Sequence, residues 1–189
     1  MMGTLSDLKR GFLVSTIFSN RRQSTGAKFL LISLIIIGLD QLTKWLCVTY
    51  IEQGSFGIEV LPFFNLVHVY NYGAAFSILA DWGGVQRYLL AGLALIITLA
   101  LTIALLRTKA EHKWTCLAYA LFIGGAIGNL IDRVILGYVI DFLLFYWRDD
   151  SGVIVWAYPA FNVADIAVCC GAALLVITAL FGGKSKKAK

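Results

Sequence analysis

Three aspartates in the second half of the chain have the surroundings of groups that do chemistry. Asp132 lies in GNLIDR, Asp141 in GYVIDF and Asp165 in FNVADI, each within or beside an apolar stretch. A carboxylate is costly to bury in such a place, so ionisable residues there are functional candidates. Two carboxylates that share a dry site do not both ionise easily, so one keeps a proton and the other is a base. Together they can activate water against a peptide bond without a metal.

The motif N-x-x-D occurs twice and adds an amide beside two of these acids. Residues three apart share a helical face, so we expect Asn129 to sit with Asp132 and Asn162 with Asp165. Asp165 lies four residues in from Phe161, about 6 Å along a helix axis. That depth is enough to desolvate the carboxylate partly and still leave it in reach of water.

The spacing alone leaves the partner of Asp165 open between Asp141 and Asp132. Asp132 lies beside Arg133 and shares a face with Asn129, which favours a supporting role. Asp141 has only apolar or aromatic residues next to it. An ionised, unpaired carboxylate is disfavoured there, so we favour Asp141 as the partner.

Membrane-spanning helices must position these acids. The chain has 189 residues, of which 59% are hydrophobic and only 14% charged, and its mean hydropathy is +0.80; soluble domains carry more charge. Its long apolar runs suit a hydrocarbon core of about 30 Å, in which the backbone must be helical. The runs are residues 29–50, 88–106, 115–131 and 161–181. We therefore expect a mainly α-helical membrane protein with four transmembrane helices, forming one domain over residues 1–189.

The distribution of Lys and Arg predicts the orientation of these spans. Basic residues concentrate before the first run, between the second and third runs, and after the fourth. The positive-inside rule then makes residues 1–28 and the basic tail 182–189 cytoplasmic. Within the first run, the apolar stretch FLLISLIIIGL is followed by DQLTKWL and not by a small-residue cleavage site, so we interpret the run as an uncleaved span. This bias explains the net charge of +5 and gives no reason to expect nucleic acid, although the tail can contact anionic lipid.

Two segments lie outside the spans, on the side opposite the termini. Residues 51–87 contain GIEVLPFFNLVHVYNYGAAFS, which predicts a small extracytoplasmic β-sheet at the membrane surface. Residues 134–160 contain two aromatic runs on either side of the turn sequence DDSG, which predicts an outer loop or hairpin. The aromatic belt of a membrane interface suits four side chains here, which are Tyr146, Trp147, Trp156 and Tyr158.

Other polar or reactive residues receive structural interpretations. Asp40 and Lys44 are four apart on one helical face, so we expect a structural ion pair. Gly124 and Gly128 form a GxxxG pair, which predicts close helix packing. The four cysteines form no CxxC pair and the two histidines stand alone, so we expect buried thiols, no metal site and no cofactor.

Two other functions stay open from the residues alone. A polar network could merely hold the helices together, and a proton-coupled membrane transporter would also place carboxylates in its spans. These acids crowd the outer edge of the spans, whereas carriers bind substrate near the midplane. We therefore favour an enzyme over the transporter and the scaffold.

Five ordered motifs make the chain resemble the lipoprotein signal peptidases, also called signal peptidase II. They are DQLTK at 40–44, FNLVHVYNYGAAFS at 64–77, GGAIGNLIDR at 124–133, YVIDF at 138–142 and PAFNVAD at 159–165. The resemblance covers nearly the whole chain after residue 25. It implies an aspartyl endopeptidase of the bacterial inner membrane, with its active site near the periplasmic face. Its substrate would be a prolipoprotein carrying diacylglycerol, cut just before the lipidated cysteine, and we expect a monomer.

The same resemblance implies roles for individual residues. The catalytic pair would be Asp141 and Asp165. The other polar motif positions would orient this pair, stabilise the outer loops or bind substrate; they are Asp40, Lys44, Asn71, Asn129, Asp132, Arg133 and Asn162. The link between the two catalytic acids looks longer than is usual in the family, with the extra residues in the RDDSG turn region.

Overall fold

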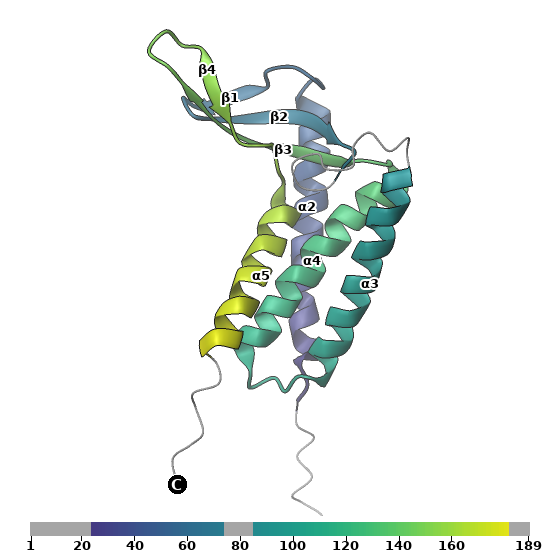
Figure 1. Ribbon diagram of the computed structural model, residues 1–189. Helices are drawn as coiled ribbons and strands as arrows, with labels where there is room; N and C mark the ends of the chain where they lie inside the picture. Colours follow the sequence, from purple (N-terminus) through teal and green to yellow (C-terminus); the bar gives the residue numbers. More distant parts are fainter. Residues whose placement is uncertain (1–23, 74–84, 182–189) are drawn as a thin grey trace, which may run out of the picture.

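Four long helices form a bundle with a β-sheet across one end (Figure 1). The computed structural model describes residues 24–73 and 85–181. Each helix is long and apolar enough to cross a membrane, which confirms the predicted fold class. The helices are α2 (Leu30–Tyr50), which follows the one-turn helix η1 (Gly26–Phe29), α3 (Val85–Arg107), α4 (Lys113–Ile135) and α5 (Val163–Phe181). The first 23 residues and the basic tail 182–189, both predicted to be cytoplasmic, lie outside the described residues.

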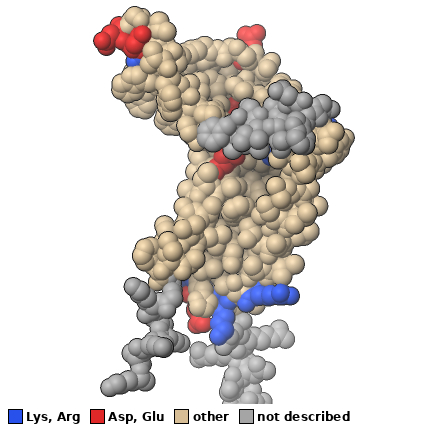
Figure 2. Space-filling model, in the orientation of Figure 1, with Lys and Arg blue, Asp and Glu red and all other residues tan. Residues whose placement is uncertain are grey.

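The start of α2 and the end of α5 lie at the same end of the bundle, opposite the sheet (Figure 1). The short basic link between α3 and α4 lies there too, where Gly26 N–H donates to Thr108 O and Ala110 N–H donates to Ser24 O. Figure 2 shows a broad uncharged band over the helices, between the basic residues of this end and the acidic residues of the sheet end. An uncharged band of this kind is what a membrane-embedded surface requires.

The predicted sheet and the predicted hairpin are parts of one antiparallel sheet. Its strands occur in the order β1-β2-β3-β4, and β2 pairs with β3 although about 70 residues separate them. The strands are β1 (Ile58–Leu61), β2 (Phe64–Asn71), β3 (Val139–Arg148) and β4 (Ile154–Ala157). Because Val69 of β2 lies opposite Asp141 of β3, this pairing carries the polar end of β2 to the carboxylate in β3.

Glycines let the helices approach closely. A Cβ at Gly124 would lie 3.0 Å from the carbonyl oxygen of Ser33 in α2, and one at Gly128 would lie 2.6 Å from an Asp40 carboxylate oxygen. The interpretation of GxxxG as a packing motif is therefore confirmed, with α2 as the partner helix. Gly171 of α5 plays the same part against α4, since its Cβ would lie 2.9 Å from the carbonyl oxygen of Ala118.

Replacing Gly171 with alanine is expected to destabilise the protein by about 1–3 kcal/mol, because overpacking forces two backbones apart. Gly92 of α3 is the matched control, since a Cβ there meets nothing within 4 Å. Gly92→Ala is expected to be neutral or stabilising, because alanine favours helix. Thermal unfolding in one detergent compares the two variants. Equal loss of stability in both would show that the approach of α5 to α4 does not depend on Gly171.

Candidate active site

Asp165 is held in the first turn of α5 by reciprocal hydrogen bonds with Asn162. The Oδ1 of Asn162 accepts the Asp165 N–H at 2.9 Å, and the Oδ2 of Asp165 accepts the Asn162 N–H at 3.2 Å. This arrangement is a capping box, in which the residue before a helix and the third residue within it satisfy each other's amides. It explains why α5 begins at Val163 and not at Phe161. It also places the Asp165 carboxylate at the positive end of the helix dipole.

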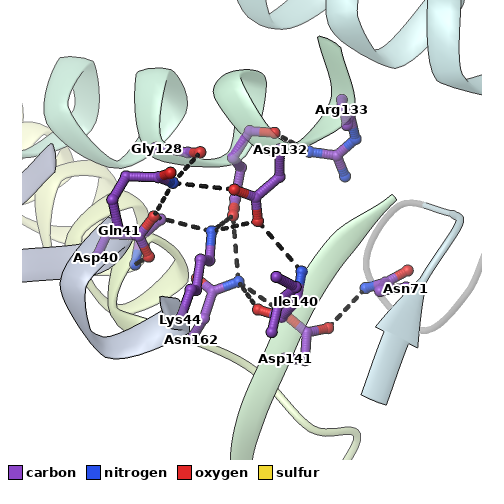
Figure 3. Close-up of polar contacts among 12 residues, drawn as sticks. Asp40, Gln41, Lys44, Asn71, Gly128, Asp132, Arg133, Ile140, Asp141 and Asn162 are labelled. Carbon is purple, nitrogen blue, oxygen red and sulfur yellow. Dashed lines mark hydrogen bonds and ion pairs between the residues drawn. The ribbon is translucent and has the colours of Figure 1, made fainter. Parts of the chain in front are cut away.

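Asp141 lies in β3 between two asparagine amides. Its Oδ2 accepts the Nδ2–H of Asn71 at 2.9 Å, and its Oδ1 accepts the Nδ2–H of Asn162 at 2.8 Å. Figure 3 shows these two amides on opposite sides of the carboxylate. The side chain is only 2% exposed. Burial, and after it the charge of Asp165, raises the pKa of Asp141 to about 7.

Asn162 links the two carboxylates directly. Its side chain donates to Asp141, while its backbone N–H donates to Asp165. Asn129 completes the link, because its Nδ2 donates to Asp165 Oδ1 at 2.7 Å and its Oδ1 accepts from Asn162 Nδ2 at 3.1 Å. Asn129 and Asp132 lie on one face of α4, as their spacing predicts, since both contact Lys44. The NH₂ of Asn129 in addition reaches across the helix interface to Asp165.

Lys44 is the buried cation behind this group. Its Nζ lies 2.8 Å from Asp40 Oδ2, 2.8 Å from Asp132 Oδ2 and 3.0 Å from Asn129 Oδ1. The predicted ion pair of Asp40 and Lys44 is therefore present, with a second carboxylate added to it. Because Lys44 faces the oxygen of Asn129, the NH₂ of that amide is turned to Asp165. A residue from α2 thus sets the direction of an amide in α4.

The carboxylate of Asp132 makes contacts that join α4 to α2 and β3. Besides Lys44, its carboxylate accepts the N–H of Ile140 at 3.2 Å and the Nε2–H of Gln41 at 2.9 Å. Asp40 has a similar task, since its Oδ1 accepts the N–H of Ala164 at 2.9 Å and ties α2 to the first turn of α5. These contacts agree with a supporting role for both residues.

Gln41 is a member of this network that the sequence reasoning missed. Its Nε2 also donates to the carbonyl oxygen of Gly128 at 3.2 Å, so it joins α2 to α4 in two places. A signal was available in DQLTK, because an amide inside an apolar span requires partners.

The two candidate acids open onto a cavity of about 590 Å³, a size suited to a peptide segment or a small ligand. Figure 2 shows acidic atoms in the hollow between the sheet and the helices. Arg133 also lines the cavity and donates to the carbonyl oxygens of Gly73 and Asn129 at 3.1 and 3.4 Å. Apolar and aromatic side chains form much of the remaining wall, namely Val69, Tyr70, Val139, Tyr158, Pro159, Phe161, Ile166 and Val168.

Among the residues described, no group of three or more His, Cys, Asp or Glu side chains is arranged to hold a metal ion. The carboxylates of Asp40 and Asp132 both pair with the ammonium group of Lys44. The cavity itself presents two carboxylates, one guanidinium and several amides. This donor set suits proton transfer to and from a polar substrate more than it suits coordination of a metal.

Comparison with known proteins places the chain in a family. The family model for signal peptidase (SPase) II matches residues 32–181. The chain belongs to the signal peptidase II family. The lipoprotein signal peptidase of Tolumonas auensis is 48% identical over 153 residues, which cover 81% of this chain and 90% of that protein. That of Haemophilus ducreyi is 46% identical over 164 residues, covering 87% and 98%.

Solved structures agree with this assignment. A structure described as that of a bacterial membrane enzyme matches with a TM-score of 0.70 and 30% identity, over 86% of this chain and 95% of the other. The protein is therefore a peptidase, and with four spanning helices it is a multi-pass protein of the bacterial inner membrane. The transporter alternative is not retained, because the family is one of peptidases.

The cysteines of this signal peptidase II only partly follow the expectation of buried thiols. Cys47 and Cys116 are buried, whereas Cys169 and Cys170 are exposed on α5. The expectation is wrong for this pair, because α5 has a side that no other part of the described protein covers. Both thiols line the cavity, where they add to its apolar wall.

Proposed function

We propose that the protein is an intramembrane aspartyl endopeptidase that removes signal peptides from diacylglyceryl-modified prolipoproteins, cutting before the lipidated cysteine. The observation that carries this proposal is a pair of carboxylates, the buried Asp141 and the half-buried Asp165, joined by Asn162 at one cavity. The relatives named lipoprotein signal peptidase support the substrate class. Both chain termini would be cytoplasmic and the site would lie near the periplasmic face, as the positive-inside rule predicts.

The two acids have different surroundings, which suggests their roles. Asp165 lies at the positive end of α5 and accepts a short hydrogen bond from Asn129, and both features favour a carboxylate. Burial and the charge of Asp165 raise the pKa of Asp141 to about 7, so we assign the shared proton to Asp141. Asp165 would then take a proton from water while Asp141 protonates the carbonyl oxygen of the scissile bond. When the resulting tetrahedral diol collapses, the C–N bond breaks, the proton gained by Asp165 passes to the leaving amine, and Asp141 takes back a proton from a diol hydroxyl.

The remaining residues have supporting tasks. Asn71, Asn129 and Asn162 orient the two carboxylates through their amides. Asp40, Lys44 and Asp132 hold α2, α4 and α5 in register behind them. Arg133 lies at the cavity wall, where its guanidinium can bind a polar group of the substrate. The apolar wall along α5, including Ile166 and the two exposed thiols, suits the acyl chains of a lipidated cysteine.

A gel-shift assay with purified protein tests this function. A prolipoprotein carrying diacylglycerol is expected to be cleaved before its modified cysteine, while the same polypeptide without lipid is not. Cleavage is expected to survive a chelator, because two carboxylates suffice for the chemistry. Cleavage that a chelator abolishes would overturn the aspartyl mechanism. Equal cleavage of the polypeptide with and without lipid would overturn the substrate assignment.

The pKa of Asp141 predicts how activity depends on pH. The mechanism requires one protonated carboxyl, and Asp141 loses its proton as the pH rises through about 7. We therefore expect kcat to be low in acid, where the base Asp165 is protonated, and to fall as the pH rises above about 7. The hydrogen bond from Asn71 lowers the pKa of Asp141 by favouring its charged form, so Asn71→Leu should move the fall to higher pH.

The pH profile is measured as kcat at saturating lipidated substrate, which reports the enzyme–substrate complex. Asp150→Asn is the control, because this residue is exposed in the hairpin turn. It should leave the profile unchanged. If the fall of kcat stays at the same pH in the Asn71→Leu variant, or moves to lower pH, the assignment of Asp141 as the acid is contradicted.

A further inference from the structure

The β3–β4 hairpin projects beyond the helix bundle. Figure 1 shows the sheet lying across the end of the bundle, with this hairpin extending past α5. Hydrogen bonds stabilise its turn, because Asp149 Oδ1 accepts from the N–H groups of Ser151 and Val153 at 3.0 and 2.9 Å. Gly152 supplies the positive φ of 83° that the turn requires. The hairpin is therefore an ordered extension with two distinct faces.

One face of the hairpin is fastened to the rest of the sheet. Tyr146 is 2% exposed, and its hydroxyl donates to Asn65 Oδ1 at 2.9 Å, so the expectation that Tyr146 joins an aromatic belt is wrong. The guanidinium of Arg148 pairs with Glu59 at 3.0 Å and lies over the rings of Phe56 and Tyr146. These contacts hold the hairpin rigidly and place its paired charges on this face.

The opposite face is aromatic and turned towards α5. Trp147 and Trp156 lie directly opposite each other across the two strands, so they share a face. Phe145 lies on the same face, and its ring stacks on that of Phe161 at 6.0 Å, just before α5 begins. We call this the aromatic face; its members are Phe64, Phe145, Trp147, Trp156, Tyr158 and Phe161.

The aromatic face is exposed where it leaves the bundle. Trp147 is 66% exposed and Trp156 is 56% exposed. Neither carries a charge, and large exposed apolar patches mark surfaces that contact a partner. The face is continuous with the membrane-spanning α5 through Phe161 and shares Phe161 and Tyr158 with the cavity wall. The partner must therefore lie beside α5 and next to the mouth of the cavity.

We propose that the aromatic face docks on the interfacial region of the bilayer, in the leaflet at the sheet end, and anchors the hairpin over the lipid beside the cavity. Trp and Tyr favour this depth because one end of each ring is apolar and the other is polar. The turn carries Asp149 and Asp150, so the contact is made through aromatic rings and not through attraction to anionic headgroups. The proposal does not depend on which residues are catalytic.

Depth-dependent fluorescence quenching tests the docking in the full-length protein. The reporter variant replaces Trp45, Trp82 and Trp114 with phenylalanine, which leaves only Trp147 and Trp156. The protein is reconstituted in phosphatidylcholine vesicles whose acyl chains are brominated either near the headgroup or near the chain end. We expect strong quenching by bromine near the headgroup, weaker quenching by deep bromine and protection from aqueous acrylamide.

A matched control moves the reporter to the fastened face of the same hairpin. It combines Trp147→Phe and Trp156→Phe with Ala157→Trp in the reporter background, since Ala157 is exposed and lies directly opposite Tyr146 on the fastened face. We expect this tryptophan to be quenched by acrylamide and not by brominated lipid. Should the background variants fail to fold, the loss of shallow-bromine quenching from native protein to a Trp147→Phe/Trp156→Phe variant gives the same readout.

Four outcomes would overturn the proposal. If acrylamide quenches the reporter tryptophans and brominated lipid does not, the aromatic face lies in water. Protection that depends on protein concentration would identify a second copy as the partner, and protection only after a lipidated peptide is added would identify a substrate surface. Quenching that requires anionic lipid would show electrostatic binding instead.

Discussion

Replacing either Asp141 or Asp165 with asparagine is expected to lower the rate of prolipoprotein cleavage by at least about 10²–10⁴-fold, the usual contribution of a general acid or base. An amide neither takes a proton from water nor donates one to a carbonyl oxygen at neutral pH. The fold should survive, because the side-chain oxygen of an asparagine at position 165 still accepts the Asn162 N–H of the capping box. Single-turnover cleavage and thermal unfolding in one detergent separate the two effects.

Two other aspartates serve as controls for this experiment. Asp150→Asn changes an exposed turn residue and should leave cleavage unchanged. Asp132→Asn should retain activity, because Lys44 keeps Asp40 as a partner at 2.8 Å. An inactive Asp132→Asn together with an active Asp141→Asn would show that the partner of Asp165 is Asp132.

Replacing Lys44 with methionine is expected to cost about 3–5 kcal/mol, the range for removing one partner from a buried ion pair. Lys44 is 2% exposed and faces Asp40 and Asp132, which are 0% and 3% exposed. Without the ammonium group both carboxylates are buried without their cation. The Asn129 amide also loses the contact that directs its NH₂ to Asp165, so activity should fall with stability. Thermal unfolding and the cleavage rate at a permissive temperature measure the two losses.

A double-mutant cycle distinguishes charge from packing in this result. Lys44→Met combined with Asp132→Asn should cost less than the sum of the two single changes, because one uncompensated carboxylate is removed. Lys113→Met is the control for loss of a lysine, since Lys113 is exposed at the start of α4. Additive losses in the cycle, or an equal loss in Lys113→Met, would exclude the buried ion group as the cause.

Much of the candidate site could be predicted from local spacing. Residues one helical turn apart share a face whatever the rest of the chain does, so Asp40 with Lys44 and Asn162 with Asp165 follow from the sequence alone. The position of Asp141 could be favoured on desolvation grounds, but its two amide partners could not. Asn71 and Asp141 meet only because β2 pairs with β3 in one register, and a shift of that register by one residue would turn Asp141 to the other face.

The sequence by itself determined the four spanning helices, the proximity of Asn162 to Asp165 and the ion pair within α2. Each of these depends on the length of an apolar run or on residues within one turn. Only the tertiary structure decided that Asn129 faces Asp165, that Asp132 is occupied by Lys44 and Gln41, and that sheet and hairpin are one element. The reason is that these contacts join α2, α4, α5 and the sheet. Their geometry depends on how closely glycines let the helices approach and on strand register, which residue spacing does not specify.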